Sequence, residues 1–171
     1  ILQRFKANAI ENTIHQKRRR QKLRELLGYL HGEGMSVMLV KGIALTALVY
    51  QAAWYTCPDD IDLLLEHPKA KVRRDQRAAI AGYAVHGIEC DAFAHHDLNM
   101  NGILPVDFAR IWRDARPLSF DDYPVYVMAP EDMLVTLCIS SARKRYFRLK
   151  AMFDIAETVA AYPTLNWPLV A

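Results

Sequence analysis

The sequence has few cysteines, no long apolar run and little excess of either charge. Its cysteines, Cys57, Cys90 and Cys138, are far apart and form no Cys-x-x-Cys pair, which argues against a disulfide framework and a thiolate zinc site. No apolar run approaches the roughly 20 residues that span a bilayer, and the first residues contain no signal-peptide core. A net charge of +3 does not by itself indicate nucleic acid. We therefore expect a cytoplasmic protein without a membrane partner.

The sequence contains enough apolar residues for one domain. The chain has 171 residues, of which 52% are hydrophobic, so it can bury a core of its own. Helical and strand-like patterns alternate along it, which predicts an α/β (α+β) fold with a small mixed β-sheet flanked by helices. Helical patterns cover 2–34, 43–51, the segment from Pro68, 106–114 and a long helix from Pro130; strand patterns cover 36–40, 61–65 and 87–94, and a hairpin covers 117–128.

These patterns divide the chain into three parts. We expect 1–34 to be a helical segment packed on the core, as one helix or two, 35–130 to be the α/β core, and 131–171 to be a C-terminal helical segment. The first residue is not methionine, which leaves room for an upstream segment, and the C-terminal segment is open to truncation.

The motif that points to chemistry is PDDIDLLL, residues 58–65, where acidic residues open an apolar strand. Side chains alternate along a strand, so Asp60 and Asp62 project from the same face with Cα atoms about 6.6 Å apart. Two such carboxylates repel each other unless a cation lies between them, and Mg²⁺ commonly binds one or two carboxylates together with substrate phosphates. The pair predicts a metal site, although acidic turns are also common and Asp62 could lie on an exposed sheet face.

A glycine turn precedes this motif. In VMLVKGIAL a strand runs into Lys41-Gly42 and then into a helix, so backbone N–H groups after Gly42 can face an anion. Lys41 would point to the same place, and an ion-paired or snorkelling lysine is an equal alternative. The pattern is a strand, a glycine turn and a helix, followed by a strand that opens with Asp-x-Asp. It indicates a phosphate-binding site beside a metal site.

The stretches LVKGIALTALVY, DDIDLLLEHP and PVYVMAPEDMLVTLCISSARKRYFRLKAMFDIAE resemble the uncharacterised bacterial nucleotidyltransferases of the polymerase-β-like superfamily. That family has an "LKG-x-x-L" helix start, a "DIDLLV" strand, an "lsPED-x-L" helix start and a late "RL-x-x-x-x-DIA" segment, in the same order. The resemblance covers nearly the whole chain. It implies a minimal nucleotidyltransferase core and transfer of a nucleoside monophosphate from a nucleoside triphosphate to a hydroxyl acceptor, with release of pyrophosphate.

The resemblance also implies site residues. Asp60 and Asp62 match the paired ligands of two Mg²⁺ ions, or of Mn²⁺, and Gly42 matches the glycine at the nucleotide-binding helix. Asp91 is the best match for the third catalytic carboxylate on a neighbouring strand, and Glu89 is its competitor. In this fold the basic segment RKRYFRLK can face the triphosphate, which makes Arg148 and Lys150 candidates beside Lys41.

The sequence departs from the family pattern at several positions. Ile43 replaces the serine usual in the superfamily, Thr56 or Cys57 stands near the place of an arginine, and Ser140 stands at the place of a histidine. His95 and His96 come later than the family's histidine. These changes are compatible with altered specificity or with lost activity. The alternative is therefore a catalytically decayed nucleotide-binding or protein-interaction module of the same fold.

A basic run of the sequence bears on the nature of the acceptor. The run QKRRRQKLRE, residues 16–25, is basic enough to suggest RNA, but such a run on a surface helix is more often a solvated face. Nucleic acid is a possible partner that the sequence does not favour. We interpret Asp154 in FDIAE as a helix-packing or capping residue.

Overall fold

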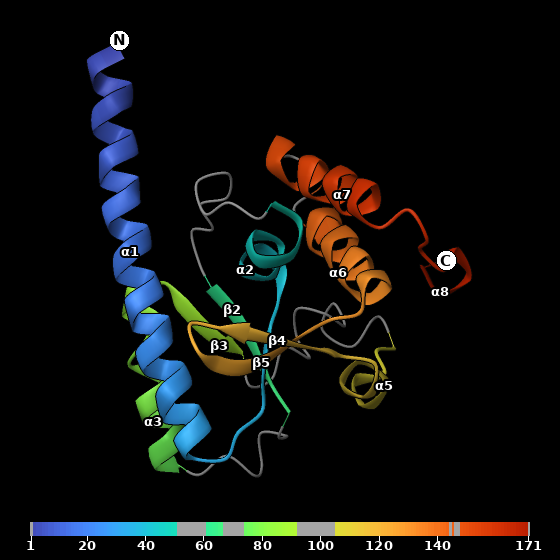
Figure 1. Ribbon diagram of the computed structural model, residues 1–171, viewed down its shortest axis with the longest axis horizontal. Coiled ribbons are helices and arrows are strands. Elements are labelled where there is room, and N and C mark those ends of the chain that lie inside the picture. Colours follow the sequence, from blue (N-terminus) through green and yellow to red (C-terminus); the bar gives the residue numbers. More distant parts are fainter. Residues whose placement is uncertain are drawn as a thin grey trace.

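The computed structural model describes residues 2–50, 61–66, 74–91, 105–143, 145 and 148–170, and it shows a five-stranded mixed sheet with helices on both faces (Figure 1). Along the chain the elements are α1 (Leu2–Gly32), β1 (Val37–Leu39), α2 (Lys41–Leu45), the π-helical η1 (Thr46–Tyr50), β2 (Ile61–Leu65), α3 (Arg74–Ala81), the 3-10 helix η3 (Ala84–His86), β3 (Ile88–Asp91), α5 (Phe108–Arg113), β4 (Arg116–Phe120), β5 (Tyr123–Val127), α6 (Pro130–Arg143), α7 (Leu149–Ala161) and α8 (Trp167–Val170). The predicted fold class is confirmed.

The strands lie in the order β3-β2-β1-β5-β4. β1 pairs antiparallel with β2 and parallel with β5, β2 pairs parallel with β3, and β4 pairs antiparallel with β5. Every residue of β1 and β2 is buried, as their continuous apolar sequences predict for central strands. The antiparallel pairing brings the end of β1 beside the start of β2.

Alternation along the strands supplies two hydrophobic cores. On one face Leu39, Leu63 and Val127 pack against the buried half of α1, and on the other Met38 and Leu64 pack with residues of α2, α5 and α6. Figure 1 shows α1 and α3 on one side of the sheet and α2, α6 and α7 on the other. Asp62 alternates with Leu63, so its side chain belongs to the α2 side.

The N-terminal segment is one continuous helix. Its C-terminal half buries Leu23, Leu26, Leu27 and Leu30 at helical spacing, which docks it on the sheet. Gly28 permits this approach, because a Cβ at that position would lie 2.8 Å from the hydroxyl oxygen of Tyr123 in β5. The N-terminal half of α1 extends beyond the sheet (Figure 1).

The C-terminal half contains two predictions that hold and one that needs correction. The hairpin forms as expected, and Asp121 and Asp122 at its tip have φ of 48° and 71°, which aspartate tolerates better than most residues. α6 begins at Pro130 with acids in its first turn, as predicted. The expected long helix is instead two packed helices, because α6 ends at Arg143 and Arg145 takes a left-handed φ of 51° before α7 begins.

Candidate functional site

Asp62 is the acidic residue of the PDDIDLLL motif that the structure describes. It is the second residue of β2 and is only 9% exposed. An ionised carboxylate at this depth requires a compensating charge or hydrogen bonds. Asp60 lies outside the described residues, as do Thr56, Cys57, His95 and His96.

The compensating charge comes from Lys41. Its Nζ atom lies 3.1 Å from Oδ1 of Asp62, and the two side chains are 21% and 12% exposed. The backbones also meet here, because the N–H of Val40 donates to the carbonyl oxygen of Asp62 at 3.3 Å. Lys41 thus places a positive charge beside one of the two carboxylates of the predicted metal site.

Lys41 reaches Asp62 from an unusual backbone conformation. Its φ is 54°, in the left-handed region that costs an L-residue about 1–2 kcal/mol. Val40 before it is extended and Gly42 follows it inside α2, so Lys41 makes the sharp turn from β1 into the helix. The carbonyl oxygen of Gly42 accepts a hydrogen bond from Oγ1 of Thr46 at 2.9 Å. Strained residues of this kind cluster at functional sites.

Two candidates for the third carboxylate lie on β3. The parallel register pairs Asp62 with Glu89 and Leu64 with Asp91. Positions 89 and 91 therefore fall on the same face of the sheet as position 62. For Glu89 and Asp91 the structure describes the backbone. In the strand register, Glu89 is the direct neighbour of Asp62. Among the described residues no group of three or more His, Cys, Asp or Glu side chains converges as a metal site.

The basic candidates near the C-terminus lie at the start of α7. Arg148 is the N-cap residue of α7 and is exposed. The ammonium of Lys150 lies 2.6 Å from Oδ2 of Asp154, and the hydroxyl of Tyr50 donates to Oδ1 at 2.6 Å. Burial and the contact with Asp154 raise the pKa of Tyr50 above its ordinary value. Asp154 thus ties η1 to α7, in agreement with its predicted packing role.

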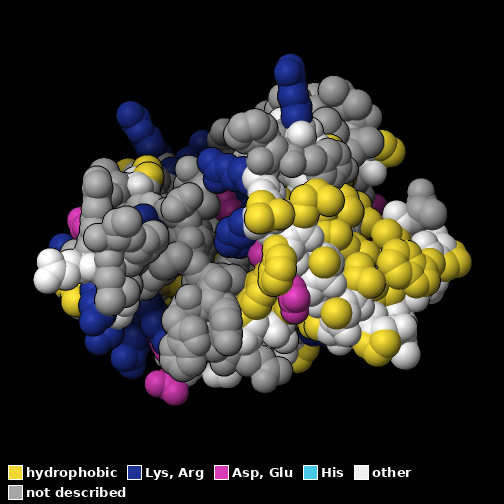
Figure 2. Space-filling view, turned by 90° about the horizontal axis from the view of Figure 1, so that it is seen from above, with side chains coloured by type: hydrophobic (Ala, Val, Ile, Leu, Met, Phe, Trp, Pro, Cys, Tyr) yellow, Lys and Arg dark blue, Asp and Glu magenta, His cyan; other side chains and the backbone are white. Residues whose placement is uncertain are grey.

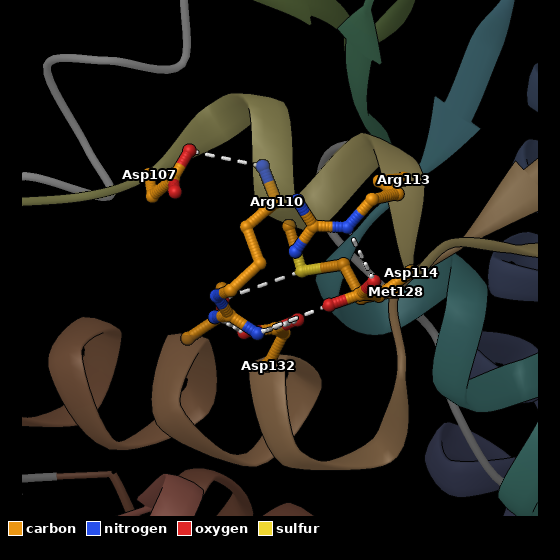
Figure 3. A network of polar contacts seen from close by, with 7 residues as sticks. Asp107, Arg110, Arg113, Asp114, Met128 and Asp132 are labelled. Carbon is orange, nitrogen blue, oxygen red and sulfur yellow. Dashed lines mark hydrogen bonds and ion pairs between the residues drawn. The ribbon is translucent and has the colours of Figure 1, made fainter.

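A second cluster of acidic and basic side chains joins α5 to α6, and no sequence pattern predicted it (Figure 3). Asp132 in the first turn of α6 is 6% exposed and pairs with both terminal nitrogens of Arg110. Arg110 also lies 3.6 Å from Asp114, and its backbone N–H donates to Asp107, which caps α5. Asp132 raises the pKa of Arg110 above its usual range. Figure 3 shows these groups directed at one another, which indicates a structural role.

The fold is that of a nucleotidyltransferase-like protein. The structure is similar to the crystal structure of an antigenic nucleotidyltransferase-like protein from Paracoccidioides brasiliensis, with a TM-score of 0.54, 14% identity, and coverage of 86% of this chain and 76% of that one. The model of a family described as uncharacterised nucleotidyltransferase matches residues 1–171, and the chain belongs to this family. No curated protein sequence matches it. The family inferred from the sequence motifs is therefore confirmed.

Among the described residues no helix is both long enough and apolar enough to cross a bilayer.

Proposed function

We propose that the chain is a metal-dependent nucleotidyltransferase that transfers a nucleoside monophosphate from a nucleoside triphosphate to a hydroxyl acceptor. One observation carries the proposal: the buried carboxylate of Asp62 is held 3.1 Å from the ammonium of Lys41, which comes from the turn between β1 and α2. Mg²⁺ commonly uses carboxylate oxygens as ligands, and the position beside Asp62 already holds a positive charge. The neighbouring turn carries the glycine that the family motif assigns to the nucleotide.

The proposed reaction is an in-line displacement. The acceptor oxygen attacks the α-phosphorus, the bond from that phosphorus to the bridging oxygen of the β-phosphate breaks, and pyrophosphate leaves. The acceptor proton passes to a carboxylate on β3 or to water. Two bound Mg²⁺ ions, or Mn²⁺, would neutralise phosphate charge and stabilise the leaving oxygen.

The residues of the chain would share this work. Asp60 and Asp62 would bind the ions, with Asp91 or Glu89 as the third carboxylate. Lys41 would leave Asp62 when metal binds there, and its ammonium would then be available to the triphosphate. The backbone after Gly42 would approach the phosphates closely. Arg148 and Lys150 remain candidates for triphosphate contacts; for Lys150 this would require leaving Asp154.

Thermal unfolding with nucleotide tests the proposal. A triphosphate that binds only the folded chain should add about 2.7 kcal/mol of stability at about 100 times its dissociation constant. For a domain of this size each kcal/mol raises the melting temperature by about 2–4 °C, so we expect a shift of roughly 5–10 °C with Mg²⁺. The shift should disappear with EDTA and in Asp62→Asn.

A matched control is Asp122→Asn, which removes the same charge from a side chain that is 96% exposed at the hairpin tip. This variant should keep the full shift. All four common nucleotides are tested, each with Mg²⁺ and with Mn²⁺. The proposal is wrong if none of them moves the transition.

A protein-interaction module of the same fold is the second candidate, and one feature favours it. α7 directs Leu149, Met152 and Phe153 outward at helical spacing, with exposures of 82%, 45% and 58%. Figure 2 shows hydrophobic side chains gathered on the side of the molecule that carries α7 and α8. Contiguous apolar surface of this kind marks binding sites in many proteins. A chain that acts only through this surface would show no metal-dependent response to nucleotide.

A further inference from the structure

A second group of basic side chains lies between α1 and the turn before β3. A cavity of about 230 Å³ is lined there by His15, Arg18, Arg19, His86 and Gly87. None of these residues is acidic, and two carry a permanent positive charge. α1 packs on the face of the sheet opposite to Asp62, so this cavity is separate from the candidate site described above.

The sequence explains why these side chains converge. His15, Arg18 and Arg19 are three and four residues apart on α1, which places them on one side of the helix. His86 ends η3, which contacts α1, and Gly87 follows with φ of 70°. This left-handed turn carries the chain into β3 and leaves His86 facing the helix across the cavity.

Three other basic residues of this part of α1 have acidic partners. Arg20 binds Asp121 through two nitrogens, Arg24 lies 3.9 Å from Asp122, and Lys22 lies 2.7 Å from Glu25. Arg18, by contrast, has no ion pair among the residues that the structure describes, and its side chain lines the cavity.

Two carboxylates lie near the histidines of the cavity. Glu11 is 3.9 Å from His15, and Glu25 is near enough to His86 for their charges to attract. These acids reduce the positive charge at the rim and are not part of the lining. Arg18 therefore supplies a positive charge in the lining that no described acid neutralises.

The size of the cavity limits the ligand. Pockets for drug-sized molecules measure about 300–1,000 Å³, so about 230 Å³ is too small to enclose a nucleotide. It is large enough for one phosphate group with some water. Guanidinium groups bind phosphate through paired, charge-assisted hydrogen bonds, and protonated histidines add further donors.

We propose that this cavity binds a single phosphate group, which comes either from free phosphate or from a phosphodiester of an RNA strand. The inference is independent of nucleotidyl transfer, because it involves neither Asp62 nor a metal ion. It assigns a role to part of the basic run at 16–25, which the sequence alone favoured only as a solvated face.

The test follows the backbone amide signals of His86 and Gly87 by NMR in the ¹⁵N-labelled full chain. Inorganic phosphate and a short oligouridylate are titrated separately with EDTA present and ionic strength constant, and chloride is the reference anion. We expect both amides to shift with phosphate. Arg18→Gln should weaken binding by about tenfold, because one charge-assisted pair is lost.

Two further variants keep the result interpretable. His86→Gln alters the opposite wall of the cavity and should also weaken binding. Arg24→Gln removes the same charge from another side of α1, where the side chain is 58% exposed, and should leave the affinity within about twofold. Arg18 is exposed, so Arg18→Gln is expected to fold normally.

The two phosphate sources give different results. If oligouridylate binds much more tightly than phosphate, with an affinity that falls steeply with salt and depends on Arg18, the source is an RNA strand. If phosphate binds and oligouridylate is no tighter, the source is free phosphate. Unmoved amides of His86 and Gly87 with both probes, or equal losses in Arg18→Gln and Arg24→Gln, would overturn the proposal.

Discussion

The ammonium of Lys41 lies 3.1 Å from Oδ1 of Asp62, across the junction between the end of β1 and the start of β2. Antiparallel pairing of these strands makes the contact possible, because it brings the residues after β1 beside the start of β2, although 20 residues separate Lys41 from Asp62 in sequence. The contact places a cation on the carboxylate that the sequence marks as a metal ligand. Metal and lysine would therefore compete for Asp62.

Lys41→Met should destabilise the metal-free protein. The carboxylate of Asp62 is 12% exposed and would lose this cation, which we expect to reduce the free energy of unfolding by about 1–3 kcal/mol. Mg²⁺ should restore more stability to the variant than to the original chain, because a metal ion no longer has to displace the lysine. Urea unfolding in EDTA and in Mg²⁺ measures both effects.

The control for this substitution is Lys22→Met, which removes an exposed lysine paired with Glu25. It should leave the free energy of unfolding nearly unchanged, with no response to Mg²⁺. Equal stabilities of the two variants in EDTA would contradict a contribution of Lys41 beyond that of a surface ion pair.

The left-handed conformation of Lys41 gives a second prediction. Lys41→Gly and Lys41→Ala both remove the ammonium, so the difference between them reports on the backbone. Because φ is 54°, we expect the glycine variant to be more stable than the alanine variant by about 1 kcal/mol. Urea unfolding in EDTA measures the difference. A more stable alanine variant would show that residue 41 is not left-handed in solution.

The sequence predicted those parts of the fold that local patterns determine. The apolar run at 61–65 became β2 with the same bounds, and Asp121-Asp122 between two strand-like runs became the hairpin tip. Proline followed by acids fixed the start of α6. In each case the residues that decide the structure are neighbours in the chain.

Features that depend on distant residues were not predictable in the same way. The segment RKRYFR between α6 and α7 contains no glycine or proline, so the sequence does not predict that the helix ends there. The pairing of Arg110 with Asp132 requires α5 to lie against α6, and the cavity at His86 requires α1 to cross η3. The sequence left an ion-paired Lys41 as an alternative, and only the strand pairing selected Asp62 as its partner.

The contact between Arg20 and Asp121 should make stability depend on acid pH. Hydrogen bonds from Arg20 hold the pKa of Asp121 below its usual value, and they join α1 to the tip of the hairpin. A carboxyl group whose pKa is lowered by folding stabilises the protein above its unfolded pKa, about 3.9, and loses this contribution as the pH falls through its folded pKa. We therefore expect Arg20→Gln to cost about 0.5–1 kcal/mol at neutral pH and progressively less below about pH 4.

Urea unfolding of both proteins between neutral pH and about pH 2 measures this difference. Arg24→Gln is the control, because Arg24 lies 3.9 Å from Asp122, whose side chain is 96% exposed. The control should cost little at any pH. A cost of Arg20→Gln that stays constant into acid would show that Asp121 does not carry the effect.

The final prediction concerns the third carboxylate of the proposed active site. The family motif points to Asp91, whereas the register pairs Glu89 with Asp62 and Asp91 with Leu64. Paired residues on neighbouring strands lie about 4.8 Å apart, and a step of two residues adds about 6.6 Å along the strand. By this register the backbone of Glu89 is nearer to Asp62 than that of Asp91. If the chain transfers nucleotides, Glu89→Gln should lower kcat/KM on the order of 10²–10³-fold, the loss expected when a group that stabilises the transition state is removed. Asp91→Asn should lower kcat/KM by less than about tenfold.

Both substitutions preserve the shape of the side chain and remove one negative charge, so each serves as the control for the other. Pyrophosphate release measures the rate. A larger loss in Asp91→Asn would show that the family motif, and not the strand register, identifies the third metal ligand.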